Sequence, residues 1–332
     1  MLLLTIPQIR AQMVRVLTDS NKLSLRGLSV VNNQTLWVSG TGGTVGRSID
    51  EGKTWIWITV PGFEKRDFRD IEAFDDQTAL IMAVAEPAAI LKTSDGGKHW
   101  RTVFLDSTKG MFLDAFDFAN EMEGTVVGDP INGKVFLATT RDGGEHWTLL
   151  PDEKRPVTAE GEAFFAASGT NLVDLGIKNG IESSLLMVSG GKKSKFWHLD
   201  SHLKSDSLPL TQGLESTGAN SIAINGKKEG IVIGGDFSKD SIATNNCVLF
   251  RLSDPITFSF PKTSPHGYRS CVTYITDKNL IACGTSGVDI SSDGGQHWTL
   301  ISKQGFHVCQ KAKKGTAVFL AGGHGRVAVL VE

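Results

Sequence analysis

The chain has 332 residues and little of what metal, redox or nucleic-acid proteins need. Its four cysteines, Cys247, Cys271, Cys283 and Cys309, form no CxxC pair and no spacing typical of metal ligands. We expect them to be small buried apolar residues, and we expect no bound metal or cofactor. Lys and Arg total 34 against 36 Asp and Glu, so the net charge of −2 gives no general attraction to nucleic acid.

Long apolar runs and dinucleotide or haem motifs are also missing. No apolar run approaches the ~18 residues that a membrane-spanning helix needs. There is no GxGxxG following a strand and no CxxCH, so nothing supports an oxidoreductase. We therefore expect neither a transmembrane segment nor a nucleotide or haem site.

The first eleven residues, MLLLTIPQIRA, are unlike the rest of the chain. Their three consecutive leucines are typical of the end of a secretory signal whose basic start is missing. We predict a signal remnant at 1–11 and a periplasmic or secreted protein. A frayed cytosolic N-terminus is the alternative.

Glycine and apolar residues are abundant. The chain has 37 Gly and only 10 Pro, and 40% of its residues are hydrophobic. This composition excludes disorder and favours many short strands joined by tight turns around a large core.

A repeated motif is the main signal. The segments 48–55, 93–100, 140–147 and 291–298 share the pattern Ser/Thr-x-Asp-x-Gly-x-x-Trp. Trp55, Trp100 and Trp147 are 45 and 47 residues apart, which is typical of one propeller blade. A fifth segment, 190–197, keeps only its Trp, and one further blade is expected to lie hidden before 291.

The motif resembles the Asp-box, or BNR, repeat of sialidase-like propellers. Its Asp can accept hydrogen bonds from backbone N–H groups of the same turn, and its Gly can adopt a positive φ. We therefore expect Asp50, Asp95, Asp142 and Asp293 to be structural and to bind neither metal nor substrate.

The order of short strands around each motif predicts an all-β, seven-bladed propeller with four strands in each blade. The blades are expected to begin near Leu25, Phe68, Met111, Glu162, Ala219, Tyr268 and Phe306. The last unit has three strands, and the apolar segment 13–18 can supply the fourth. Such closure removes a free sheet edge, so we expect one domain over 12–332.

Superposing the repeats gathers charged residues at one end of the central channel. The first strands would bring Arg26, Arg69 and Arg269 to equivalent inner positions, with His307 and His324 nearby. Four carboxylates, Glu86, Asp129, Glu162 and Asp236, would surround them. Convergent charge in a hollow is typical of a polar ligand site. The alternative is a ring of structural ion pairs around a watery channel.

Four further segments carry a resemblance to a known family. The segments 68–75, 127–134, 235–239 and 267–270 resemble bacterial exported relatives of the photosystem II assembly and stability factor propellers. The resemblance covers about 25–331. It implies a non-enzymatic chaperone that binds partners through an arginine patch. The insertion at 236–247 departs from that pattern.

The sequence leaves two alternative functions open. The first is a monomeric, non-enzymatic binding or assembly scaffold whose arginine rim binds an anionic small molecule, a glycan or a protein partner. The second is a glycoside hydrolase in which two of the four rim carboxylates act as acid and base or nucleophile. A sialidase would also need an arginine triad and a tyrosine nucleophile, for which Tyr268 is the candidate. The Arg-Ile-Pro signature of that family is absent.

Overall fold

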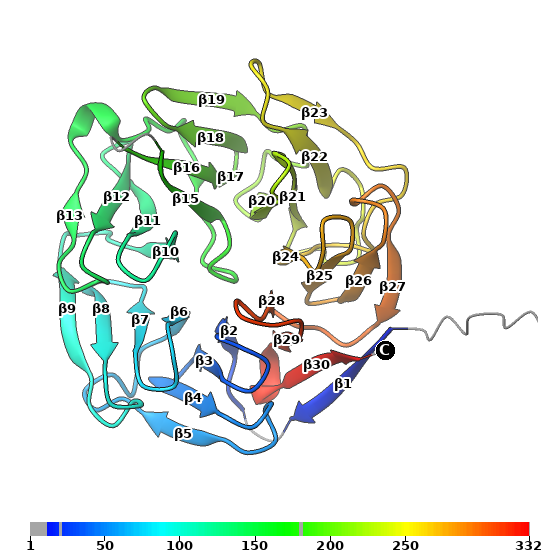
Figure 1. Cartoon of the computed structure of the whole chain (residues 1–332). Coiled ribbons are helices and arrows are strands. Elements are labelled where there is room, and N and C mark those ends of the chain that lie inside the picture. The colour runs from blue at the N-terminus through cyan, green and yellow to red at the C-terminus, as the bar shows by residue number, and fades with distance from the viewer. Residues whose placement is uncertain (1–11, 20–21, 179–181, 332) are drawn as a thin grey trace, which may run out of the picture.

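The computed structural model describes residues 12–19, 22–178 and 182–331. These residues form a ring of seven blades around a central axis, each a four-stranded antiparallel sheet (Figure 1). Their only helical turns are η1 (Asp152–Lys154) and η2 (Gly323–Gly325). The predicted seven-bladed, all-β propeller is confirmed. The predicted signal remnant lies outside the described residues.

Within each blade, the four strands follow one another in order from the axis to the outer edge (Figure 1). The innermost strands, from blade one to blade seven, are β2 (Leu25–Val30), β6 (Phe68–Ala73), β10 (Leu113–Phe118), β15 (Leu172–Lys178), β20 (Thr217–Ile224), β24 (Cys271–Tyr274) and β28 (Val308–Lys311). The second strands are β3 (Leu36–Gly40), β7 (Ala79–Ala83), β11 (Gly124–Ile131), β16 (Glu182–Val188), β21 (Glu229–Asp236), β25 (Leu280–Gly284) and β29 (Val318–Ala321).

The two outer positions complete each sheet. The third strands are β4 (Thr44–Ser48), β8 (Ala88–Thr93), β12 (Lys134–Thr140), β18 (Lys195–Leu199), β22 (Cys247–Arg251), β26 (Gly287–Ser291) and β30 (Val327–Val331). The outermost strands are β5 (Ile56–Thr59), β9 (Arg101–Asp106), β13 (Thr148–Leu149), β19 (Leu203–Ser207), β23 (Thr257–Ser259), β27 (Thr299–Ser302) and β1 (Met13–Thr18).

The ring closes as the sequence predicts. Strand β1, from the N-terminal end of the described chain, pairs antiparallel with β30, with Met13 opposite Val331 (Figure 1). It is the fourth strand of blade seven. The pairing covers the edge that β30 would otherwise expose. None of the described segments forms a helix long and apolar enough to cross a membrane.

The core lies between neighbouring blades. Every residue of β7 and of β8 is buried, whereas β5 at the outer edge is mostly exposed. Sheets that are covered on both faces need nearly continuous apolar strands, which explains runs such as Ala-Leu-Ile-Met-Ala in β7. The outermost strands have few fully buried residues because one side of each meets water.

The Asp-boxes join the third strand to the fourth on the face opposite the starts of the innermost strands. In the box at 93–100, Asp95 Oδ1 accepts hydrogen bonds from the Thr93 hydroxyl at 2.9 Å and the His99 N–H at 3.0 Å. Trp100 Nε1 donates to the Gly97 carbonyl at 3.1 Å, and Gly97 has a φ of 87°. The carboxylates of Asp50, Asp142 and Asp293 accept equivalent bonds from their own turns.

Blade four differs from the sequence expectation. Glu162 does not begin its innermost strand, because Glu162 lies in β14 (Glu162–Ala163), which pairs with β17 (Gly190–Gly191). These two short strands extend the sheet of blade five beyond β20, and blade four begins at β15. Trp197 lies in β18, the third strand, and so is not the tryptophan of an Asp-box.

A segment of the chain crosses the channel between β14 and β15. We call residues 164–170 the channel segment. It contacts blade five through Thr170, whose hydroxyl donates to Ser221 Oγ at 2.8 Å, and blade six through Ser168, which donates to the Ser270 carbonyl at 2.7 Å. Gly169 has a φ of 68°, and a Cβ there would collide with the carboxylate of Asp70 in blade two. A cavity of about 300 Å³ remains beside this segment along the axis.

Candidate functional site

The innermost strands share a bulge at the end that faces the predicted rim. In blade one, Leu25 pairs with Gly40 and Gly27 with Ser39, so Arg26 is the extra residue. The same irregularity isolates the equivalent residue in blades two, three and five, namely Arg69, Asp114 and Asn220. A bulge redirects the side chain of its extra residue, and here it places one polar side chain of each of these blades near the channel mouth.

The predicted superposition is wrong by one residue in blades three and six. The backbone N–H groups of Leu25 and Leu113 each donate to a backbone carbonyl of the preceding blade, at 3.1 and 3.0 Å. In blade six, the N–H group that makes this hydrogen bond, at 3.0 Å, is that of Arg269. Arg269 therefore occupies the apolar position of Leu25 and Leu113. Asp114 and Ser270 stand where Leu113 and Arg269 were expected.

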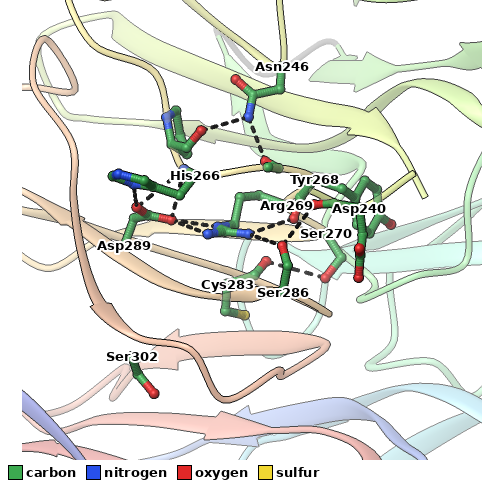
Figure 2. A network of polar contacts seen from close by, with 12 residues as sticks. Asp240, Asn246, His266, Tyr268, Arg269, Ser270, Cys283, Ser286, Asp289 and Ser302 are labelled. Atoms are coloured by element: carbon green, nitrogen blue, oxygen red, sulfur yellow. Dashed lines mark hydrogen bonds and ion pairs between the residues drawn. The ribbon is translucent and has the colours of Figure 1, made fainter. Parts of the chain in front are cut away.

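Arg269 is part of a buried polar network (Figure 2). Its side chain is fully buried and forms an ion pair with Asp289, to which its Nε donates at 2.6 Å. Its Nη1 donates to the Tyr268 carbonyl and the Ser286 hydroxyl at 2.8 and 2.9 Å. The Nδ1 of His266 lies 2.6 Å from the other oxygen of Asp289. Arg269 thus joins strands within blade six and is not exposed to a ligand.

Arg26 and Arg69, which we call the arginine pair, have far fewer partners. Arg26 Nη1 donates to the carbonyl of Ala167 in the channel segment at 3.3 Å, and among the described residues it forms no ion pair. Arg69 forms an ion pair with Asp67 at 3.6 Å, keeps 30% of its side chain exposed and covers the ring of Phe112. It pairs with neither Asp70 nor Glu86. The pair stands on neighbouring blades.

The pair creates a positive field at the channel mouth. Burial lowers the pKa of Arg26, and the charge of Arg69 lowers it further. Burial, with both arginines adding to it, lowers the pKa of His307 to about 3, so this histidine is neutral near pH 7. His307 Nε2 lies 3.2 Å from the Ser24 hydroxyl. Asp67 offsets part of this positive charge, and an anion placed here would offset more of it.

Two acids lie on the blade-three side of the pair. Asp114 is fully buried, and neither of its carboxylate oxygens makes a hydrogen bond of normal geometry. Burial raises its pKa well above the usual range, the charge of Asp129 raises it further, and Arg69 opposes both. Burial also raises the pKa of Asp129 to about 6, although the Phe164 N–H donates to it at 3.0 Å. Sequence reasoning missed Asp114 because it placed Leu113 at the rim.

Glu162 and Asp236 are engaged elsewhere. Glu162 is buried, pairs with Lys195 at 2.9 Å and accepts a hydrogen bond from the Ser189 hydroxyl at 2.6 Å. Asp236 accepts hydrogen bonds from the N–H and hydroxyl of Ser238, at 2.9 and 2.7 Å. Glu162 therefore joins β14 to blade four, and Asp236 stabilises its own loop.

The remaining predicted site residues have different surroundings and do not form one site. Glu86 is exposed and accepts a hydrogen bond from the Gly110 N–H at 3.0 Å. Tyr268 is buried, its hydroxyl donates to Asn220 at 2.9 Å, and burial raises its pKa. His324 is exposed in η2 with a φ of 61°. None of the contacts described joins two of the four candidate carboxylates.

Sequence comparison adds a similarity to a known family over part of the chain. The profile described as Photosynthesis system II assembly factor YCF48 matches residues 57–180, from β5 into blade four. The chain is a BNR propeller that resembles YCF48. A comparison with curated proteins gives no match.

Solved structures agree on the fold. YCF48 bound to D1 peptide is 16% identical, with 100% of this chain and 99% of that chain covered and a TM-score of 0.68. YCF48 from Cyanidioschyzon merolae is 15% identical, with 96% and 98% covered and a TM-score of 0.64. A GH74 enzyme from Niastella koreensis is 13% identical, with 95% of this chain and 53% of that chain covered and a TM-score of 0.63. Such identities show the fold alone, and proteins of different roles share it.

Proposed function

We propose that this chain is a non-enzymatic binding scaffold whose arginine pair binds an acidic segment of a protein partner. The observation that carries the proposal is the contrast among its arginines. Arg269 is buried in an ion pair with Asp289, whereas Arg26 and Arg69 lie at the channel mouth with few partners. A guanidinium offers fixed, paired donors that match the two oxygens of a carboxylate.

The choice of a peptide as ligand draws on similarity. A propeller that matches the chain over its whole length is described as bound to a D1 peptide. The channel segment also occupies part of the channel beside Arg26, whose Nη1 donates to the Ala167 carbonyl. An exposed acidic peptide can reach the arginine pair without entering the channel.

The hydrolase alternative has no observation in its favour. Acid and base carboxylates must face one substrate bond from opposite sides, at defined separations. Glu162 instead joins β14 to blade four, Asp236 stabilises its own loop, and Asp129 holds the channel segment through Phe164. Tyr268 is buried and its hydroxyl donates to Asn220, so this candidate is not presented as a nucleophile.

The test is the affinity of an acidic peptide. We would measure fluorescence anisotropy with a labelled Gly/Ser decapeptide ending in Asp-Asp. Arg69→Ala should weaken binding about tenfold or more, since a charge-assisted hydrogen bond is lost. Arg141→Ala, an exposed arginine in an Asp-box on the opposite face, is the matched control and should bind normally.

Two results would overturn the proposal. One is equal binding by the Arg69→Ala and Arg141→Ala variants. The other is no peptide binding at millimolar concentration while sulfate or sialic acid binds, which would make the site one for small anions.

A further inference from the structure

Three large apolar side chains are exposed together on the rim face of blade five. Leu214, Phe237 and Ile242 are 55%, 49% and 43% exposed, and we call them the apolar rim patch. Leu214 precedes β20, and the other two follow β21, so all three lie at the end of the blade where the innermost strand begins. Clustered exposed apolar residues commonly mark a contact surface.

Local hydrogen bonds bring the two loops together. The Phe237 N–H donates to the Ser216 carbonyl at 3.1 Å, and the hydroxyls of Ser216 and Ser238 are 3.3 Å apart. Leu214 lies two residues before Ser216. The Ile242 N–H donates to the Lys239 carbonyl at 3.0 Å, which folds the second loop into a compact turn.

The second loop belongs to the insertion at 236–247 and is anchored to blade six. The carbonyl of Asp240 accepts hydrogen bonds from the Tyr268 N–H and the Ser286 hydroxyl, both at 2.8 Å. The Asp240 carboxylate accepts another from Thr285 at 2.8 Å. Asp240 stands beside Tyr268 and Ser286 in Figure 2. The patch is therefore presented on a fixed support, which lowers the entropy lost when a partner binds.

Packed aromatic rings link the patch to the arginine pair, since Phe165 lies in the channel segment whose Ala167 carbonyl accepts a hydrogen bond from Arg26. The ring of Phe237 packs edge-on against Phe165 at 5.8 Å and against Tyr268 at 6.3 Å between ring centres. Tyr268 is close enough to Arg26 for each to affect the pKa of the other. A row of aromatic rings thus leads from the exposed patch to the positive channel mouth.

We propose that the apolar rim patch binds a large apolar side chain of the same peptide whose acidic group the arginine pair binds. This inference rests on the proposed function and adds a second requirement to it. The partner segment would be extended, with a carboxylate at one point and a Phe, Leu or Ile a few residues away. The charge would set the position of the peptide, and the apolar contact would add affinity and selectivity.

The experiment compares two kinds of decapeptide on the full chain. One is the Gly/Ser peptide ending in Asp-Asp. The others carry one Phe at successive positions before the Asp residues. The best Phe peptide should bind wild type about tenfold more tightly than the peptide without Phe, the scale expected for burial of part of an aromatic ring.

Variants separate the two parts of the site. Phe237→Ala and Leu214→Ser should each remove most of the Phe-dependent gain and leave binding of the Phe-free peptide unchanged. Arg69→Ala should weaken both peptides. Met122→Ala removes an apolar side chain that is 53% exposed on the turn between β10 and β11, on the opposite face, and should change neither.

The outcomes distinguish the two proposals. If the acidic peptides bind through Arg69 but neither Phe nor the two patch variants change their affinity, the apolar site is wrong and the arginine site stands. If only Phe237→Ala has an effect, and it weakens both peptides alike, Phe237 supports Arg26 through Tyr268 and is not a contact. If no acidic peptide binds wild type, both proposals fail.

Discussion

The arginines of blades one and two have surroundings opposite to those of the arginine of blade six. When the blades are superposed, their positions differ by one residue. Arg26 and Arg69 occupy bulges at the channel mouth and have few partners. Arg269 occupies the neighbouring apolar position, where burial is complete and Asp289 balances its charge. The comparison shows that a shift of one residue along a strand decides whether an arginine can reach a ligand or stabilises the core.

The largest effect should come from breaking the buried pair. Asp289→Ala would leave Arg269 charged and unpaired in the core, and we expect unfolding to become easier by about 3–5 kcal/mol. Denaturant unfolding measures this. The double variant Arg269→Met with Asp289→Leu is the control, because it removes both charges and should lose much less. Equal losses in the two variants would mean that packing, not charge, explains the effect.

The second effect concerns the arginine pair. Arg26→Ala and Arg69→Ala should each change the free energy of unfolding by less than about 1 kcal/mol, because rim charges contribute little to stability. The same variants should lose most binding of the acidic peptide. A loss of stability comparable to that of Asp289→Ala would contradict the comparison and assign the arginine pair to the scaffold.

Asp114 offers a way to strengthen the site. Asp114→Asn keeps the shape and removes a buried carboxylate without hydrogen bonds of normal geometry, so stability at pH 7 should rise by about 1 kcal/mol or more. Loss of the negative charge beside Arg69 should also tighten binding of the acidic peptide. Weaker binding would show that Asp114 positions Arg69 for its ligand.

A smaller effect is expected from pH. Because burial raises the pKa of Asp129 to about 6, this acid takes up a proton between pH 7 and pH 5. The raised pKa means that its contribution to stability is present at low pH and is lost as pH rises through about 6. Protonation removes the negative charge of Asp129, which opposes binding of an acidic peptide. Peptide carboxylates themselves stay ionised above about pH 5. The affinity for the peptide should therefore increase severalfold from pH 7.5 to pH 5.5. Asp129→Asn should reduce this dependence, and Asp114, whose pKa burial also raises, accounts for any that remains.

The smallest effect is expected from a substitution in an Asp-box, on the face opposite the arginine pair. Hydrogen bonds from its own turn lower the pKa of Asp293 to about 2, so its stabilising contribution is present above about pH 4 and is lost as pH falls towards 2. Asp293→Ala should cost about 0.5–1 kcal/mol at pH 7, a value reduced by its exposure to solvent. Peptide affinity should not change, as thermal melts and anisotropy on one sample can verify.

The sequence predicts the ring better than the site. The four Asp-boxes are local signals, and each marks the third and fourth strands of one blade. Blade four has no such box, and the apolar character of Phe164 and Phe165 imitates a strand where the chain instead crosses the channel. The closure by Met13–Thr18 could be predicted because an unpartnered apolar strand needs an edge to cover.

The register of the innermost strands could not be read from the sequence. A bulge adds one residue without changing the alternation that precedes it, so Leu113 and Asp114 are equally plausible at the rim until the pairing with Gly128 is known. The burial of Arg269 depends on Asp289, which lies 20 residues later in the chain, and on the fold that brings them together. Long-range charge pairing of this kind leaves no local pattern.

Side-chain NMR of the arginine Nε–H groups during titration with the Asp-Asp peptide tests the central claim most directly, because it observes all three arginines in one sample. We expect the Arg69 and Arg26 signals to shift with a common dissociation constant. The Arg269 signal, already bonded to Asp289, should not move. A shift of Arg269, or saturation without any shift of Arg26 and Arg69, would contradict the assignment of the arginine pair as the binding site.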